Sequence, residues 1–251
     1  MRVAAIYDIH GNLPALEAVL EEIGQAKVDR IVVGGDVLPG PLPRETLQCL
    51  LDLEIPAQFI RGNGDREVLA QMSGVETEWY RKAPEAWREP VRWSAQQLRP
   101  EHQRVLESWP ATYRLTLPGR GDVLFCHATP RNDTDIFTRL TEENVLLPIF
   151  EGLGVSLVVC GHTHMQFDRT VGSTRVVNAG SVGMSFGTPG AAWLLLGADI
   201  ELRHTRYDLS RAAERIRSTP YPQGEEFACR NILQPPSEEK TLAAFTRAGL
   251  K

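Results

Sequence analysis

Seven side chains able to bind metal ions occur in five short polar clusters, and each cluster directly follows an apolar run typical of a strand. The clusters contain Asp8 and His10, then Asp36, then Asn63, then His127, and finally His162 and His164. Loops at the carboxyl edge of a parallel sheet can bring side chains from several strands to one crevice. We therefore expect the five clusters to meet at such an edge.

The donor atoms of these clusters form a mixed oxygen and nitrogen set. Three carboxylate or amide oxygens and four imidazoles suit Mn²⁺, Fe, Zn²⁺, Ni²⁺ or Co²⁺. Seven ligands are too many for one ion. They predict two divalent or trivalent transition-metal ions about 3.5–4 Å apart, bridged by one carboxylate and a hydroxide, with open positions for in-line attack on phosphorus.

The first part of the chain predicts alternating strands and helices. Strands are expected at 3–7, 31–33 and 58–60, and helices from Asn12, as a cap, through 23 and from Pro43 through 53. This order is typical of parallel βαβ units. From 66 to about 110 the pattern becomes helical and predicts an insert beside the active site, with helices beginning near Pro84 and Pro100.

Four of the five tryptophans lie in this insert, namely Trp79, Trp87, Trp93 and Trp109. We expect them to form its core, with stacking of one ring on a substrate base as the alternative.

The remaining elements complete a single domain that spans 1–251. A hairpin is predicted at 113–117 and 123–125, a helix at 142–150 and a strand at 155–159. Later strands at 167–171, 175–177, 192–196 and 200–207 are expected to form a second sheet, followed by a helix at 210–217. A proline-rich tail at about 221–251 contains no recognisable motif.

The ordered motifs Asp-x-His, Gly-Asp, Gly-Asn-x-Asp, x-His and Gly-His-x-His resemble those of the calcineurin-like metallophosphoesterases, in particular their bacterial and archaeal phosphodiesterase-like branch. The similarity covers Asp8 to His164, and the stretches 9–16 and 178–183 are also family-like. The resemblance implies an α/β fold, namely a four-layer α/β/β/α sandwich of two mixed sheets with the dinuclear site at one edge.

The resemblance also implies a role for each ligand. Asp8, His10 and His164 would hold one metal, Asn63, His127 and His162 the other, and Asp36 would bridge them. The implied reaction is hydrolysis of a phosphoester, most simply a phosphodiester, by a metal-bridging hydroxide. The ions would neutralise charge on the phosphate oxygens, and Asn63 would help to fix the second metal and the phosphate.

Two other functions remain open. One is hydrolysis of a phosphoanhydride such as a dinucleoside polyphosphate, which only substrate profiling separates from diesterase activity. The other is a non-catalytic binding scaffold, because the resemblance includes a retromer subunit with this fold. The complete set of chelating residues favours an enzyme over a scaffold.

Two positions depart from the family pattern. Many members have a histidine after the asparagine of the third motif, where it is thought to protonate the leaving group, but this chain has Gly64. The identity of the general acid is therefore open. The residue before His127 is usually glycine and is Cys126 here, which we expect to be a small buried neighbour.

Several further polar residues have two interpretations. Arg131 could bind a substrate phosphate through its planar guanidinium, or be a solvated loop residue. Asp65 could orient a metal ligand or cap the following helix. His102 and His204 lie outside the clusters and are expected at the surface.

Composition limits the partners and the compartment. With 42% hydrophobic and 24% charged residues the chain is an ordinary globular protein, and its net charge of −5 argues against an extended nucleic-acid surface. A small phosphoester or nucleotide substrate remains compatible with this charge, since the metals would supply local positive charge. No signal peptide or membrane span is visible, and the four cysteines are widely spaced, so we expect a reduced cytoplasmic protein of unknown oligomeric state.

Overall fold

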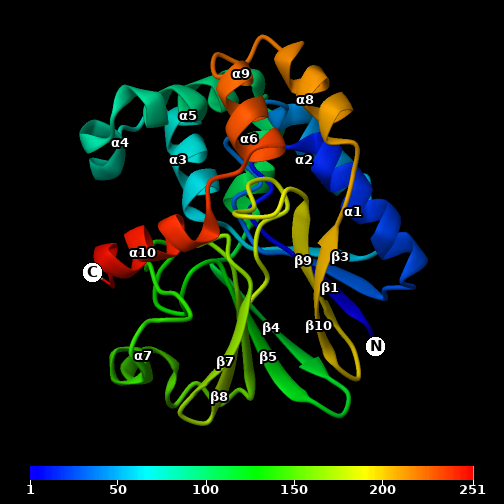
Figure 1. Cartoon of the computed structure of the whole chain (residues 1–251), viewed down its shortest axis with the longest axis vertical. Helices are drawn as coiled ribbons and strands as arrows, with labels where there is room; N and C mark the ends of the chain where they lie inside the picture. Colours follow the sequence, from blue (N-terminus) through cyan, green and yellow to red (C-terminus); the bar gives the residue numbers. More distant parts are fainter. Residues whose placement is uncertain (251) are drawn as a thin grey trace.

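The strands form two five-stranded sheets in the computed structural model, which describes residues 1–250 (Figure 1). The first sheet has the order β10-β9-β1-β2-β3, with β1 (Val3–Ile6), β2 (Arg30–Val33), β3 (Ala57–Phe59), β9 (Ala191–Leu196) and β10 (Ile200–Thr205). The second has the order β4-β5-β6-β8-β7, with β4 (Thr112–Leu117), β5 (Gly121–Cys126), β6 (Leu157–Cys160), β7 (Phe167–Val171) and β8 (Thr174–Asn178). Both sheets are mixed, because parallel β1-β2-β3 and β5-β6-β8 are flanked by antiparallel strands.

The membership of the second sheet differs from the sequence prediction. The strands that follow His164 do not form a sheet of their own. Strands β7 and β8 extend the sheet that contains β5 and β6, whereas β9 pairs antiparallel with β1 and carries β10 with it. All six residues of β9 are buried, as expected for a strand inside a sheet rather than at an isolated edge.

Residues of β1 alternate between two hydrophobic cores. Ala4 and Ile6 face helices outside the first sheet, whereas Val3 and Ala5 face the second sheet, where Phe125 is fully buried. A third core lies between the outer face of the second sheet and α7 (Glu143–Phe150). The order is therefore helix, sheet, sheet and helix, which confirms the four-layer prediction.

The helices beside the first sheet follow the predicted pattern. They are α1 (Leu13–Gln25) and α2 (Pro43–Leu51). Asn12 caps α1, because its side chain accepts a hydrogen bond from the backbone N–H of Ala15 at 3.3 Å. The buried face of α1 includes Leu16, Val19 and Ile23, and their helical spacing places them against the sheet.

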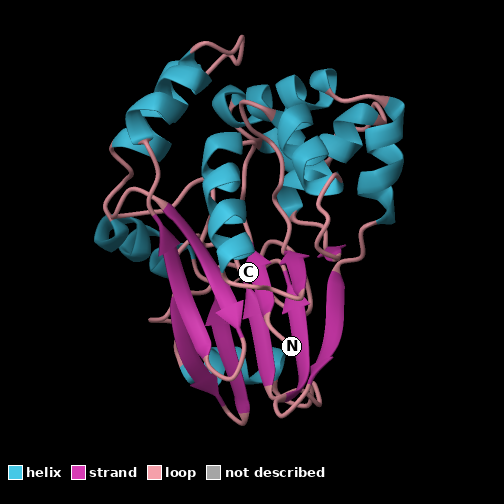
Figure 2. Ribbon diagram, turned by 90° about the vertical axis from the view of Figure 1, so that its right-hand side faces the viewer, coloured by secondary structure: helices cyan, strands magenta, loops and turns pink. Residues whose placement is uncertain are grey.

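A second group of helices lies beyond one end of the sheets, as Figure 2 shows. The segment between the third and fourth metal motifs forms α3 (Asn63–Met72), α4 (Glu78–Lys82), α5 (Glu85–Gln97) and α6 (Pro100–Ser108). Their buried residues Tyr80, Val91 and Leu106 belong to the same core as the first sheet. The helices are therefore packed into the main body of the protein.

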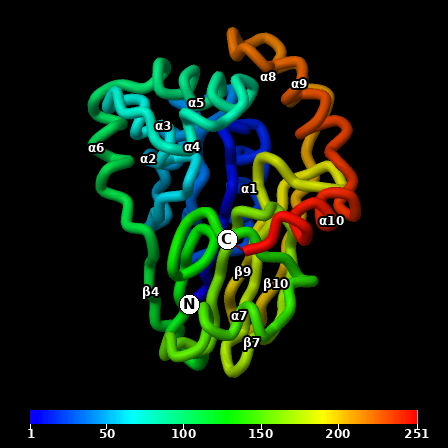
Figure 3. The backbone as a smooth tube through the Cα atoms, turned by 90° about the vertical axis from the view of Figure 1, so that its left-hand side faces the viewer, coloured from blue at the N-terminus to red at the C-terminus, as the bar shows by residue number. Residues whose placement is uncertain are grey.

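The C-terminal segment contains four further helical elements. These are α8 (Leu209–Arg217), α9 (Gly224–Phe227), the π-helix η1 (Ala228–Leu233) and α10 (Glu238–Ala248). In Figure 3 they stand on the opposite side of the upper end from α3 to α6. None of the helices in residues 1–250 combines the length and apolarity needed to cross a membrane.

Candidate metal centre

The backbone is strained at the residues that the sequence predicts as ligands. Within residues 1–250, six non-glycine residues have a positive φ. They are Asp8 (53°), His10 (48°), Lys27 (50°), Asp36 (50°), His162 (66°) and His164 (58°). Such left-handed conformations are uncommon outside glycine and tend to occur at functional sites. Five of the six are predicted ligands, so the strain is concentrated where the motifs place the chemistry.

Backbone hydrogen bonds join the loops that follow β1 and β2. The N–H of Asp8 donates to Gly35 O at 3.0 Å, and the N–H of His10 donates to Asp36 O at 3.0 Å. Buried backbone groups are thus paired between the two loops rather than left unsatisfied. This pairing fixes the first two motifs against each other.

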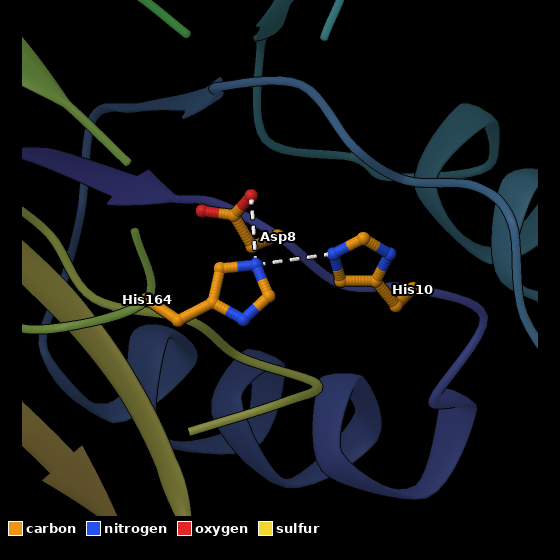
Figure 4. Close-up of side chains that lie close together, drawn as sticks. All are labelled: Asp8, His10 and His164. Carbon is orange, nitrogen blue, oxygen red and sulfur yellow. Dashed lines mark hydrogen bonds and ion pairs between the residues drawn. The ribbon is translucent and has the colours of Figure 1, made fainter. Parts of the chain in front are cut away.

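The first and last motifs meet in one buried cluster, shown in Figure 4. His10 Nε2 lies 3.2 Å from His164 Nε2, and His164 Nε2 lies 3.4 Å from Asp8 Oδ1. Asp8 Oδ1 is buried but has no hydrogen-bond partner. A buried carboxylate oxygen without a partner is costly. A cation bound by these three residues would remove that cost, so the donor set fits a metal.

A second cluster lies beside the first and shares Asp8 with it. His127 Nε2 lies 3.6 Å from Asp36 Oδ1 and 3.8 Å from Asp8 Oδ1. His10 Nε2 is 3.8 Å from Asp36 Oδ2, so Asp36 lies between the two clusters. This position is compatible with the bridging role that the resemblance implies.

Asn63 joins the remaining histidine, His162, to the second cluster. Its Oδ1 lies 3.0 Å from His127 Nε2. With the amide turned over, the nitrogen donates to His127 Nε2 at 3.0 Å and to His162 Nδ1 at 2.9 Å. The amide can therefore satisfy the two rings without a cation, or present its oxygen with the two ring nitrogens to one. All seven predicted ligands are thus brought together.

Backbone carbonyls orient two of the imidazoles. His127 Nδ1 lies 3.0 Å from Gly34 O, and His164 Nδ1 lies 3.0 Å from Met184 O. A carbonyl can only accept, so each Nδ1 carries the proton and donates. The lone pair of each Nε2 then faces the carboxylates, which is the usual arrangement of a metal-binding histidine.

Burial sets the protonation states of this cluster. It lowers the pKa of His10 and of His162 to about 3, so both rings are neutral and able to bind a metal at neutral pH. Burial also raises the pKa of Asp36, and the charge of Asp8 adds to the effect. Burial opposes ionisation of Asp8 as well, but the neighbouring His164 lowers the Asp8 pKa below its usual value.

Asp65 holds the metal loops in place. Its buried carboxylate accepts hydrogen bonds from the backbone N–H groups of Asp36 (2.8 Å), Leu38 (3.0 Å) and Gly62 (3.0 Å). Burial, followed by the charge of Asp36, raises the pKa of Asp65 to about 7. Asp65 therefore both caps α3, through Gly62, and positions the Asp36 loop, so the two roles considered from the sequence coexist.

Gly64 has no room for a side chain. A Cβ atom there would lie 2.4 Å from Leu38 O and 3.0 Å from Asp36 Oδ1. The N–H of Gly64 also donates to Asp36 Oδ1 at 2.7 Å. The close backbone packing around Gly64 therefore leaves no space for the histidine that many family members have at this position.

The loop after β8 supports the Asp8 and Gly161 motifs through side-chain hydrogen bonds. Ser181 Oγ donates to Asp8 O at 2.7 Å, and Asn178 Nδ2 donates to Gly161 O at 2.6 Å. Neither Ser181 nor Asn178 is among the predicted site residues. Their position in the family-like stretch 178–183 was the signal that could have identified them.

Three sequence expectations about single residues have different outcomes. Arg131 is bound to Asp135, with Nε–Oδ2 and Nη2–Oδ1 distances of 2.5 and 3.2 Å, and it does not line the cleft beside the metal cluster. Its contact with substrate stays a prediction. His204 is exposed, as expected. The surface position expected for His102 is wrong, since it is buried and accepts from the Arg99 N–H at 3.0 Å to cap α6.

The tryptophans of this segment differ in their burial. Trp109 is buried and stacks on Phe59 with ring centroids 4.9 Å apart, as expected for a core residue. Trp79 and Trp87 are 38% and 61% exposed, so the prediction that they form the insert core is wrong. Both line a cleft of about 570 Å³ that is also lined by the predicted ligand Asn63. The sequence could not predict the exposure of these two rings, because the helical pattern does not show which other elements pack against a helix.

The fold and the cluster of predicted ligands, with its positive φ angles and the unpaired Asp8 Oδ1, define a metallophosphoesterase-like protein. A comparison with known families agrees. A model of the calcineurin-like phosphoesterase superfamily domain matches residues 1–199. The chain therefore belongs to the calcineurin-like phosphoesterase superfamily, a family of phosphoester hydrolases.

Individual relatives extend the similarity to nearly the whole chain. An uncharacterized protein of Methanocaldococcus jannaschii is 26% identical over 241 residues, which cover 88% of this chain and 94% of that protein. A metallophosphoesterase from Sphaerobacter thermophilus is 26% identical, has a TM-score of 0.68, and matches 92% of this chain and 98% of its own.

A hypothetical protein from Pyrococcus horikoshii has a TM-score of 0.80 at 19% identity, with coverage of 94% of this chain and 99% of its own. At that identity the similarity shows the fold alone. Its coverage of 94% of this chain nevertheless extends beyond residues 1–199.

Proposed function

We propose that this protein is a metal-dependent phosphodiesterase with a dinuclear centre formed by the seven ligands. The buried Asp8 Oδ1 without a hydrogen-bond partner, surrounded by imidazole nitrogens, is the observation that carries the proposal. When bound, Mn, Fe, Zn, Ni or Co ions would supply Lewis-acid stabilisation of phosphate charge and activation of water.

The chain's own residues would prepare the site for this chemistry. Asp8 and Asp36 place carboxylate oxygens beside imidazole nitrogens, a mixed oxygen and nitrogen set that suits transition-metal ions. Asn63, at the N-terminus of α3, lines the cleft and would contact the phosphate as well as a metal. The α3 N-terminus itself favours an anion at this position.

The test measures the metal content of the purified chain and its rate of hydrolysis of bis(4-nitrophenyl) phosphate before and after chelation. We expect about two transition-metal ions per chain, loss of hydrolysis on chelation, and recovery on addition of a single type of metal. Two ions per chain without hydrolysis of any phosphoester would instead support the scaffold alternative.

Asp36→Asn is the most informative ligand substitution. A neutral amide leaves the charge of two neighbouring cations uncompensated, so we expect metal content to fall to one ion or fewer and activity to be lost. Asp199→Asn, in the exposed turn between β9 and β10, is the matched control and should keep both. Full activity of Asp36→Asn with fewer than one metal per chain would rule out the dinuclear proposal.

A further inference from the structure

The cleft beside the metal centre has aromatic walls. It has a volume of about 570 Å³, in the range of small-molecule sites, and reaches His10, Asp36 and Asn63. The aromatic residues that line it are Trp79, Trp87, Phe186, Tyr221 and Phe227. They come from the helices between the metal motifs and from the C-terminal part of the chain.

One wall presents exposed tryptophans. Trp79 on α4 and Trp87 on α5 are 38% and 61% exposed. Large apolar side chains left in contact with water beside a concave site commonly mark a binding surface. The same helical segment buries Trp109 against Phe59, so its exposed rings are not a consequence of a missing core.

The opposite wall is held against the first by specific contacts. Tyr221 packs edge-on against Trp93 of α5, with ring centroids 6.2 Å apart. Gln223 Nε2 donates to Ala86 O at 2.8 Å. The wall continues into the π-helix η1, an irregular element often found at functional sites. The cleft is therefore a fixed feature of the structure.

Phe186 connects the aromatic walls to the metal ligands. Its ring stacks on His164, with centroids 5.6 Å apart and an interplanar angle of 20°. It also contacts Phe245 of α10 edge-on, with centroids 6.2 Å apart. An aromatic substituent of a phosphate bound at the metal ligands would therefore contact apolar rings directly.

The charges in the cleft limit the substrate further. Apart from the metal ligands, its lining contains the carboxylates of Glu67 and Glu226 and one guanidinium, Arg230. Arg230 is paired with Glu226 at 3.1 Å, and Glu67 with Arg66 at 2.7 Å. A chain of several phosphates needs cationic partners along its length. The lining offers none free, so it suits a substrate with a single phosphate anion.

We propose that this cleft binds an uncharged aromatic group, a nucleobase or an aryl ring, on the ester that a monoanionic phosphodiester retains after hydrolysis. The inference rests on the proposed phosphodiesterase function and specifies its substrate class. It excludes dinucleoside polyphosphates and small alkyl diesters as the preferred substrates.

The experiment compares three diesters with the same leaving group, namely methyl, phenyl and thymidine 5′-esters of 4-nitrophenyl phosphate. Hydrolysis of each adds water across the P–O bond to 4-nitrophenolate and leaves the methyl, phenyl or thymidine monoester. Stacking of one ring on an aromatic side chain is worth about 5- to 150-fold in affinity. We expect kcat/KM to be higher by at least the lower factor for the phenyl and thymidine esters.

Variants locate the preference in the cleft. Trp87→Ala and Trp79→Ala should reduce the phenyl-to-methyl ratio of kcat/KM toward one, mainly through KM, and Trp87→Phe should retain part of it. Leu202→Ala, an exposed apolar position on β10 that is not part of the lining, is the matched control and should keep the wild-type ratio. Equal wild-type rates on the three esters, or an unchanged ratio in both alanine variants, would overturn the proposal.

A binding measurement separates this inference from the proposed function. Phenylphosphonate and methylphosphonate carry the same anion on a P–C bond that is not hydrolysed. We expect phenylphosphonate to bind the metal-loaded protein more tightly, with a change in tryptophan fluorescence that Trp87→Ala diminishes. Absence of hydrolysis of all three esters would contradict the proposed function, whereas hydrolysis without aromatic preference, or equal phosphonate binding, contradicts only the inference. Faster hydrolysis of diadenosine tetraphosphate than of the thymidine ester would contradict the charge argument.

Discussion

The buried carboxylate of Asp65 illustrates how single residues that do not bind a metal determine the site. It accepts three backbone hydrogen bonds from two loops, one of which carries Asp36. From the sequence, Asp65 is expected either to orient a metal ligand or to cap the following helix. Its contacts with Asp36 and Leu38 depend on the approach of another strand end and could not be read from local spacing.

Asp65→Asn tests this positioning role. The amide has one oxygen for three donors, and its NH₂ group would face backbone N–H groups. Each unsatisfied buried group costs roughly 1–3 kcal/mol, and loss of a residue that orients metal ligands typically costs about 10- to 100-fold in metal affinity. We expect both losses, measured by urea unfolding of the metal-free protein and by metal titration.

Asp208→Asn provides the matched control for Asp65→Asn. Asp208 caps α8 from an exposed position by accepting from the Arg211 N–H at 2.9 Å. Asparagine is also a good N-cap, so stability and metal affinity should change little. Wild-type metal affinity in Asp65→Asn would show that the loop keeps its shape without this carboxylate.

Gly64 leads to a prediction about the leaving group. Insertion of the family's histidine is a poor test, because even a Cβ would approach Leu38 O to 2.4 Å and disturb Asp36. The wild-type enzyme is therefore the better subject. Without a general acid, the rate of hydrolysis is lower by about 10²–10⁴-fold, mostly for substrates with poor leaving groups. We expect log kcat/KM for a series of aryl methyl phosphates to fall steeply as leaving-group pKa rises.

A control keeps this measurement interpretable. Solvent viscosity should leave the rates unchanged, which would show that chemistry and not diffusion is limiting. A shallow slope under those conditions would mean that another group on the protein already donates the proton.

Among the elements, helices were easier to predict than the grouping of strands. The α1 helix has a cap and a continuous apolar face, and both are local signals. The pairing of β9 with β1 joins residues nearly 190 positions apart in sequence, at Ala5 and Leu194. Chain order suggested instead that neighbouring strands share a sheet, which is common but not obligatory. Strand order depends on which buried faces pack together, and this is a tertiary property.

The helices α3 to α6 were predicted as an insert, but their packing shows that they cannot be shortened to a turn without loss of core. Leu106 on α6 is fully buried in the core of the first sheet. Leu106→Ala should therefore destabilise the protein by about 2–5 kcal/mol, as for other buried leucines. Urea denaturation of the metal-free protein measures the effect.

Leu140→Ala is the matched control for Leu106→Ala, because Leu140 is 56% exposed in a loop. Surface substitutions of this kind usually change stability by no more than about 0.5 kcal/mol. Equal stabilities of the two variants would show that α6 folds separately from the first sheet.

For the molecule as a whole, the predicted metal ligands come from both sheets. Asp8 and Asp36 follow strands of the first sheet, whereas His127 and His162 follow strands of the second. The predicted ligands span more than 150 residues of sequence, so the unfolded chain cannot hold them in this arrangement. The ordered motifs predicted this convergence, because the carboxyl ends of parallel strands meet at one edge. The aromatic cleft needed the C-terminal segment as well, and no motif marked it.

Metal binding should therefore stabilise the entire fold. A ligand that binds only the native state adds about 2.7 kcal/mol when its free concentration is 100 times Kd. For a protein of this size, each kcal/mol shifts Tm by roughly 2–4 °C. We expect Tm to rise by about 5–11 °C on metal loading, and the rise to be reversed by a chelator and reduced in Asp36→Asn. An unchanged Tm, with metal analysis showing that the ions bind and leave, would mean that the unfolded chain binds them as tightly as the native fold does. In that case the strain at Asp8 and His10 would be carried by the fold alone, and metal binding would contribute function without contributing stability.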